Sequence, residues 1–504
     1  MRRLLPILGL LVLLPSQLLA ASPSTIPTVE VVTLDNGLTL MLREDHSVPL
    51  VSVELRSRAG SILDPKTHSG LAELTATLLT YGTETRTEDE IADTLALLGG
   101  TLSAGAGPET FSVSGSVPTI SPSAFEQWLE LFIEVVRKPS FPEDAVKRVK
   151  RRRLSQLAGL KDNRRVLARR TLMQSLFGDH PYGRAASGTI KSVASILRQD
   201  IVNFHHTFFL PDDAVLGIAG DFNRNEVVDV LSRTLGRQEW GELCESPGNC
   251  KRTCRKEGGF CTQYARLSQA PYINPYPTLK TAALDTAQIL LLDVDDPTLN
   301  QAQIRLGNVL GVDYTAPEWM AYYVGAQVLG GDFNARLNQE LRVKRGLTYG
   351  ARWVTQPDDI ASGAAYAATY TNPKNVVGAL RTILNELSRF HKEPPTQAEL
   401  ARVKNRLTNG FVFRFETPGK VLSQYMDLWQ EQLPVTRLQS YKQRVRNVSH
   451  DDIRKVSQLV PTTQWIAVVV ANASLLPELQ EFASTIGATV RVVKVDWLGL
   501  AAER

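Results

Sequence analysis

EVVTLDNGLTLMLREDHSVPLVSVELRSRAGSILD, residues 30–64, is the stretch that determines how this chain begins to fold. The Asn-Gly pair at 36–37 lies between two alternating apolar segments, and such a pair is a strong signal for a two-residue β-hairpin turn. A second turn, around residues 45–49, leads into a further strand, LVSVELRS. The stretch therefore predicts a hairpin followed by a third strand.

The next segment predicts a helix over about residues 70–81, because leucines recur on one helical face at Leu71, Leu74 and Leu78. Residues 288–330 repeat the whole plan: QILLLDVDDPTLNQAQIRLGNVLG predicts strand, turn, strand and loop, and EWMAYYVGAQVLGG predicts a helix that ends at a glycine pair. Near its end, each half also contains an apolar run that predicts a buried strand, at 214–222 and at 465–473. The chain is therefore expected to contain two copies of one unit.

Long charge-rich segments between these landmarks are expected to be helical, for example residues 143–178 and 397–415. Residues 99–117 alternate apolar and small polar residues, which predicts an antiparallel strand pair. The predicted fold class is α+β, with two homologous domains that each hold a mostly antiparallel sheet with helices packed on one face. The predicted segments are an N-terminal domain at 28–235, a linker at 236–280 and a C-terminal domain at 281–504.

The composition is that of an ordinary globular protein, since 43% of the 504 residues are hydrophobic and 21% are charged. A formal net charge of +4 is small for this length, and no basic, aromatic-bearing stretch accompanies it. Nucleic acid is therefore not an expected partner.

The N-terminus has the pattern of a cleavable secretory signal, predicted over residues 1–21. Arg2 and Arg3 precede an apolar run over residues 4–19, and small residues follow it. A membrane anchor is the alternative, but the run is short and is interrupted by proline and polar residues. We expect an exported chain without stable membrane insertion, periplasmic if the source is a Gram-negative bacterium.

Four cysteines lie close together in the predicted linker. In an exported chain, this clustering favours two local disulfides, for which three pairings are possible. A structural zinc site is the alternative, although zinc ligands usually come in C-x2-4-C pairs and two of the gaps here are longer. The four are Cys244, Cys250, Cys254 and Cys261.

Four segments together indicate a family. GLAELTATLLTYGT (70–83) resembles the G-L-A-H-x-x-E-H helix of the pitrilysin/insulinase-type zinc metallopeptidases, the inverzincins, and DHPYGRAASG (179–188) resembles their H-P-Y-G segment. FFLPDDAVLGIAGDF (208–222) is similar to the strand that closes their first domain, and GGDFNARLNQELRVKRGLTYGARW (330–353) to a segment of their second. The resemblance implies two domains joined into a clam-like half-chamber, in the bacterial processing-peptidase-like branch.

The zinc motif of that family is degenerate here. The family places two histidines four positions apart on one helix, where both reach the metal, and a glutamate between them polarises the bound water. The first histidine position is Glu73, the glutamate position is Ala76 and the second histidine position is Thr77. The later glutamate ligand should fall near Gln156, in a stretch (145–161) without acidic residues. We predict that the chain holds no catalytic zinc at this place.

Nearby residues do not replace the lost ligands. His68 precedes Glu73 by five positions, which is about 140° around a helix, so the two side chains face apart. His205 and His206 are adjacent and also point apart. The basic run at 147–153 predicts a solvated helix face; an electropositive wall for acidic peptides is the less favoured alternative.

Arg342 and Tyr349 are seven positions apart in LRVKRGLTY, and this spacing matches an Arg/Tyr pair of the family's second domain. The resemblance implies that these two side chains contact the scissile carbonyl and the neighbouring backbone of a peptide. An Arg supplies a fixed charge and forked donors, and a Tyr supplies a hydroxyl that can stabilise a developing oxyanion. Arg345 lies in the same run but not at a matching position.

The resemblance therefore implies a non-catalytic subunit that is inactive alone. It would form a heterodimer with an H-x-x-E-H homologue, which would carry the zinc, and would contribute to metalloendopeptidase activity on peptides. Family substrates add as a strand to a sheet edge, and residues 109–117 are expected to be this chain's copy of that edge.

Two alternatives belong to other classes. The first is a non-enzymatic scaffold or peptide-binding module with the peptidase fold, which would have no use for the Arg342 and Tyr349 pair. The second is a self-sufficient hydrolase that uses an unorthodox metal site or the cysteine cluster, and it is the least favoured because the cysteines lie far from both motif helices in sequence.

Overall fold

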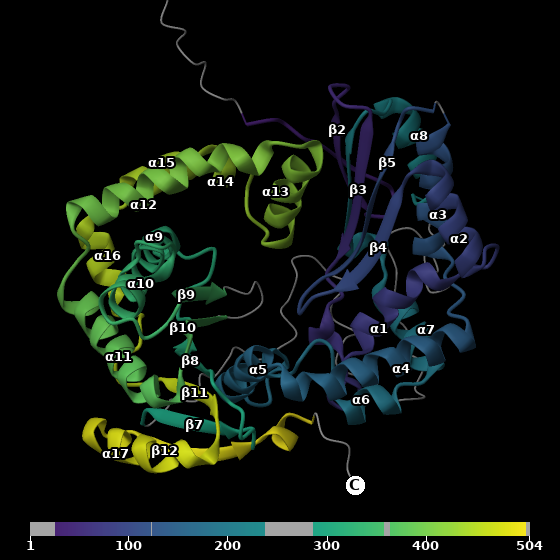
Figure 1. The fold of residues 1–504 in the computed structure, drawn as a ribbon. Helices are drawn as coiled ribbons and strands as arrows, with labels where there is room; N and C mark the ends of the chain where they lie inside the picture. The colour runs from purple at the N-terminus through teal and green to yellow at the C-terminus, as the bar shows by residue number, and fades with distance from the viewer. Residues whose placement is uncertain (1–25, 122, 237–285, 357–362, 500–504) are drawn as a thin grey trace, which may run out of the picture.

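The computed structural model describes residues 26–121, 123–236, 286–356 and 363–499 (Figure 1). The predicted signal peptide and the four cysteines lie outside these ranges, so the export and disulfide predictions stay predictions. Within them, no helix is both long and apolar enough to cross a membrane.

The first sheet contains the predicted hairpin. The connection between the first two strands is longer than a two-residue turn: it runs from Leu34 to Leu38, and the amide of Gly37 donates to the carbonyl of Leu34. Gly37 takes a φ of 90°, which glycine adopts without steric cost. The strand order is β1-β2-β6-β3-β5-β4, with β2 parallel to β6 and the other neighbours antiparallel. The strands are β1 (Glu30–Thr33), β2 (Thr39–Glu44), β3 (Leu50–Ser57), β4 (Thr101–Ala106), β5 (Phe111–Pro118) and β6 (Ala214–Gly220).

The second sheet repeats the first. Its order is β12-β7-β11-β8-β10-β9, with β7 parallel to both β11 and β12. In each half a strand from late in the unit is inserted between two early strands: β6 lies between β2 and β3, and β11 lies between β7 and β8. The strands are β7 (Gln288–Asp293), β8 (Ala302–Val309), β9 (Ala351–Gln356), β10 (Ala364–Thr371), β11 (Ile466–Ala471) and β12 (Thr489–Lys494). The predicted α+β fold of two related halves is confirmed.

Helices surround both sheets (Figure 1). Those of the first half are α1 (Leu71–Leu78), α2 (Glu88–Leu98), α3 (Ala124–Arg137), α4 (Glu143–Gly159), α5 (Arg164–Phe177), α6 (Ile190–Ser195), α7 (Arg198–Phe208) and α8 (Arg224–Thr234). Those of the second half are α9 (Trp319–Gly330), α10 (Arg336–Asn338), α11 (Val376–Lys392), α12 (Gln397–Gly410), α13 (Pro418–Gln430), α14 (Thr436–Gln439), α15 (Tyr441–Asn447), α16 (His450–Ser457) and α17 (Leu476–Ile486).

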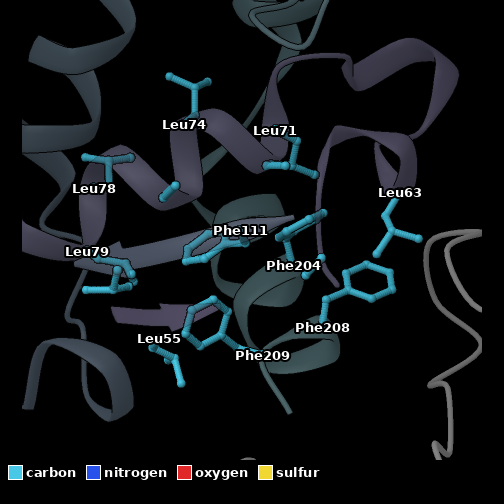
Figure 2. Packing of buried hydrophobic residues seen from close by; sticks show 14 of the residues in the cluster. Leu55, Leu63, Leu71, Leu74, Leu78, Leu79, Phe111, Phe204, Phe208 and Phe209 are labelled. Carbon is cyan, nitrogen blue, oxygen red and sulfur yellow. The ribbon is translucent and has the colours of Figure 1, made fainter. Parts of the chain in front are cut away.

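The short helix α1 lies over an aromatic core. Figure 2 shows the phenylalanines of β5 and of the α7 segment gathered beside it. The rings of Phe111 and Phe209 meet edge to face, with centroids 4.3 Å apart. Such aromatic pairs contribute about 0.5–1.5 kcal/mol beyond the area that they bury. The buried leucines of α1 are therefore anchored on the sheet, and this sets the direction of its remaining side chains.

Each domain contributes one helix that packs against the sheet of the other domain. Helix α5 of the first half packs on β8 and β11 of the second, and α13 of the second half packs on β2, β3 and β6 of the first. At the second contact the helix approaches the strand closely: a Cβ at Gly217 would lie 2.5 Å from a methyl group of Leu422, so a larger residue would force the leucine to move. Both sheets are therefore covered on the face that is turned away from their own helices.

One expectation about the first sheet is wrong. Residues 109–117 were expected to supply its exposed edge, but β5 lies between β3 and β4, and β4 is the edge strand. Both strands were predicted as a pair over residues 99–117. Alternation along a strand predicts which face is buried, but it carries no information on which member of a pair stands outside.

Candidate functional site

Helix α1, which carries the degenerate zinc motif, is held at its N-terminus by a buried carboxylate. Asp64 accepts hydrogen bonds from the amides of Gly70 (2.7 Å) and Ala72 (2.8 Å). Burial raises the pKa of Asp64 to about 7, although these amides and the nearby Arg184 act in the opposite direction. The first turn of α1 is thus capped by a side chain from the preceding loop.

The residue at the first histidine position already has a cationic partner. The carboxylate of Glu73 lies 2.5 Å from the guanidinium of Arg153, which comes from α4. Ala76 is fully buried and offers no ligand atom. The hydroxyl of Thr77 donates to the backbone carbonyl of Glu73, at 2.8 Å. Gln156 lies exposed on α4.

This set of side chains does not fit a zinc ion. Structural and catalytic zinc sites use at least three nitrogen, sulfur or carboxylate ligands. Here the one carboxylate is paired with a guanidinium, whose positive charge would repel the metal. Within the described residues, no group of three His, Cys, Asp or Glu side chains is placed to hold a metal ion.

A second guanidinium lies close to the same carboxylate. The pKa of Arg170 is lowered to about 10, mainly by burial. The charge of Glu73 acts to raise this pKa, and the charges of Arg153 and Arg169 act to lower it. Arg170 also donates to the hydroxyl of Ser187 at 2.5 Å. The place of the zinc motif is therefore occupied by an excess of positive charge.

The pattern of the basic run at 147–153 predicts a solvated face, and this prediction misses Arg153. That interpretation holds for Arg151, which is exposed, but the side chain of Arg153 is turned inward. A signal was present: Arg153 follows the buried Val146 and Val149 at the spacing of one helical face.

The histidines stay apart, as expected. His68 lies before α1 and faces Asp200, with 3.8 Å between Nε2 and Oδ2. His205 is buried in α7, where its Nε2 is 3.0 Å from the carbonyl of Val136, and His206 is exposed.

The Arg/Tyr pair lies on the surface of the second domain. Arg342 belongs to a π-helical turn, Gln339–Lys344, and its guanidinium lies 4.8 Å from the ring centre of Phe333. Tyr349 lies between this turn and β9 and is 79% exposed. Phe333 and Val343 are each 54% exposed. We call these four residues the exposed Arg/Tyr patch.

Comparisons with known proteins agree with this geometry. Residues 39–190 match the model described as Insulinase (Peptidase family M16), and residues 195–407 match the Peptidase M16 inactive domain. Together the two matches span well over half of the chain. The chain belongs to the insulinase family of peptidases, M16.

Curated M16 relatives resemble the chain over most of their length. An uncharacterized zinc protease of Mycobacterium leprae is 26% identical over 396 residues, which are 78% of this chain and 80% of that protein. The non-peptidase homolog YmxG of Helicobacter pylori is 23% identical over 419 residues, or 82% and 87% of the two chains. Among solved structures, a peptidase M16 inactive domain from Pseudomonas fluorescens has the same fold, with a TM-score of 0.74, 24% identity and coverage of 88% and 98%. This M16 chain is thus a peptidase-like protein whose own metal motif is lost.

Proposed function

We propose that this chain is the non-catalytic partner subunit of an exported zinc peptidase, and that it presents Arg342 and Tyr349 to the substrate site of an H-x-x-E-H homologue. The zinc would belong to the homologue, and the N-terminal signal would send this chain to the same compartment. Alone, the chain would be inactive.

The observation that carries the proposal is the contrast between the two motif regions. On α1, Glu73 at the first histidine position is occupied by its ion pair with Arg153. Arg342 and Tyr349, in contrast, lie exposed at the surface. Exposed large side chains that cluster on a soluble protein commonly mark an interaction surface. The exposed Arg/Tyr patch joins such side chains to a cation held over an aromatic ring, which suits the binding of a peptide backbone or of a partner.

The test is to purify the chain alone and together with an H-x-x-E-H homologue from the same organism. Co-purification, zinc content and cleavage of a quenched unfolded peptide are measured for each preparation. We expect zinc and cleavage only when the homologue is present, with Arg342→Ala lowering kcat by about 10²–10³, as for the loss of one transition-state donor.

Arg345→Ala is the matched control. This exposed neighbour forms an ion pair with Glu340 at 3.7 Å and lies outside the family pattern. Its loss should leave cleavage unchanged. Full activity of the Arg342→Ala complex would overturn the proposal, and a stable complex that cuts no unfolded peptide would favour the scaffold alternative.

A further inference from the structure

Helix α5 carries arginines into the contact between the two domains (Figure 1). Arg165 and Arg169 are one helical turn apart, so they share a face of α5. Arg169 donates to the side-chain oxygen of Gln356 on β9, at 3.3 Å. Both side chains are exposed rather than packed in the core.

Two more arginines face them from the second sheet. Arg305 on β8 and Arg352 on β9 both pair in register with Ala368 of the intervening β10. Side chains in direct register across neighbouring strands lie on the same face, so the two arginines flank the small methyl group of Ala368. Arg352 is exposed, whereas Arg305 is only 6% exposed. We call Arg165, Arg169, Arg305 and Arg352 the interdomain arginine cluster.

The positive charge of this cluster is not neutralised by the described part of the chain. Arg305 donates to the backbone carbonyls of Ile304 (2.8 Å) and Thr369 (3.1 Å), so its hydrogen bonds are satisfied by neutral groups. Burial lowers the pKa of Arg305 to about 10; the nearby phenol of Tyr366 favours the charged form, whereas Arg165 and Arg352 oppose it. None of the four arginines has a carboxylate within ion-pair distance among the residues described.

The arginine next in sequence to Arg165 shows that pairing is possible here. Arg164 forms an ion pair with Asp296, which follows β7. Among the described residues, the cluster itself therefore has no carboxylate partner, although the neighbouring Arg164 has one. Buried charges in proteins are normally paired, and an unpaired one with like-charged neighbours favours the binding of an anion. Guanidinium groups bind carboxylates with two parallel hydrogen bonds.

We propose that the interdomain arginine cluster binds the side-chain carboxylates of an acidic peptide. This inference deepens the proposed function, on which it rests, by naming the class of peptide that the subunit selects. The two exposed arginines of α5 and the exposed arginine of β9 would meet the carboxylates directly. The buried Arg305 would act through its charge, which is weakly screened at that depth.

The test uses the full chain alone, without partner or zinc. A short fluorescent peptide rich in glutamate, amidated at its C-terminus, is titrated with protein, and anisotropy gives the dissociation constant. A peptide with every Glu replaced by Gln should bind at least about tenfold more weakly, and rising salt should weaken the acidic peptide selectively. Arg165→Gln and Arg352→Gln should each weaken its binding about threefold to tenfold.

Arg151→Gln is the control, because Arg151 is an exposed arginine outside the cluster. It should bind the acidic peptide like the wild type, and thermal melts should show that all three variants are folded. Equal binding of the two peptides, or equal weakening by Arg151→Gln, would overturn the proposal. Displacement by inorganic phosphate at matched ionic strength, as effective as displacement by unlabelled peptide, would reassign the cluster to a phosphate ligand. The cleavage test with Arg342→Ala is independent, so failure of the subunit role and failure of this site are distinguishable.

Discussion

The guanidinium of Arg153 lies 2.5 Å from the carboxylate of Glu73 and links α4 to α1 at the place of the lost zinc motif. A metal ion and a guanidinium are both cations, so Glu73 keeps a positively charged neighbour without a metal. The two side chains are 17% and 24% exposed, so solvent screens their attraction less than that of a surface pair, and removal of one partner leaves the other charge partly desolvated.

Removal of either partner should therefore destabilise the first domain. Arg153→Gln is expected to cost about 1–2 kcal/mol because it leaves Glu73 half-buried and poorly paired. Glu73→Gln should cost a similar amount, because no carboxylate would then offset the repulsion between Arg153 and Arg170. The double variant should lose less than the sum, with a coupling of about 1 kcal/mol. Thermal melting measures the effect, at about 2–4 °C per kcal/mol for a domain of this size. Strictly additive losses would show that the pair has no role in stability.

The close approach of α13 to β6 predicts a second coupling. Gly217→Ala would place a methyl group 2.5 Å from Leu422, and such overpacking costs about 1–3 kcal/mol. Leu422→Ala should cost about 2–4 kcal/mol, because it leaves a cavity between the domains. In the double variant the new methyl fills part of that cavity, so the loss should be smaller than the sum.

Gly378→Ala provides the contrast. This glycine lies in α11, and no described atom other than its own helix backbone and chain neighbours comes within 4 Å of the Cβ position. Alanine should therefore stabilise the helix by about 0.5–1 kcal/mol. If Gly217→Ala proved as harmless as Gly378→Ala in thermal melts, the contact between the domains would be looser than the 2.5 Å approach indicates.

The sequence predicts the local elements of this fold but not the contacts between distant segments. Turn residues and alternation predicted β1, β2, β3 and the β4–β5 pair, because these depend on local chemistry. Two features depend on contacts between residues far apart in the chain. One is the insertion of β6 between β2 and β3, and the other is the packing of α5 and α13 on the sheet of the opposite domain. The lost zinc motif could be predicted from three positions on one helix. Its replacement by Arg153 could not, because the partner lies on another helix.

Buried His205 predicts a specific loss of stability in acid. Burial lowers the pKa of His205 to about 4 from the usual 6.5, so the folded protein binds this proton more weakly than the unfolded chain. The contribution to stability is complete above pH 6.5 and is lost as the pH falls toward 4. The difference corresponds to about 3 kcal/mol. His205→Gln should therefore lose less stability than the wild type between pH 7 and pH 4, although it is less stable at pH 7.

The control for this measurement is His206→Gln, at the exposed neighbouring position. Melting temperatures of the three proteins are compared across the same pH range. The His206→Gln protein should follow the wild type. A wild-type curve parallel to that of His205→Gln would mean that His205 takes up its proton in the folded state as easily as in the unfolded chain.

Substitutions at Tyr349 can distinguish a role in binding the partner from a role in the reaction. Tyr349 is 79% exposed, so it can serve either to dock a partner or to place its hydroxyl at a reacting carbonyl. Tyr349→Phe keeps the ring and removes only the hydroxyl. If the hydroxyl stabilises an oxyanion, this variant of the complex should lose about 10²–10³ in kcat, with KM, zinc content and subunit affinity unchanged. Tyr349→Ala should in addition weaken association, because it removes the exposed ring. A Phe variant with wild-type kcat and an Ala variant with weak association would assign Tyr349 to docking alone, and the chemistry on this side of the site would then rest on Arg342.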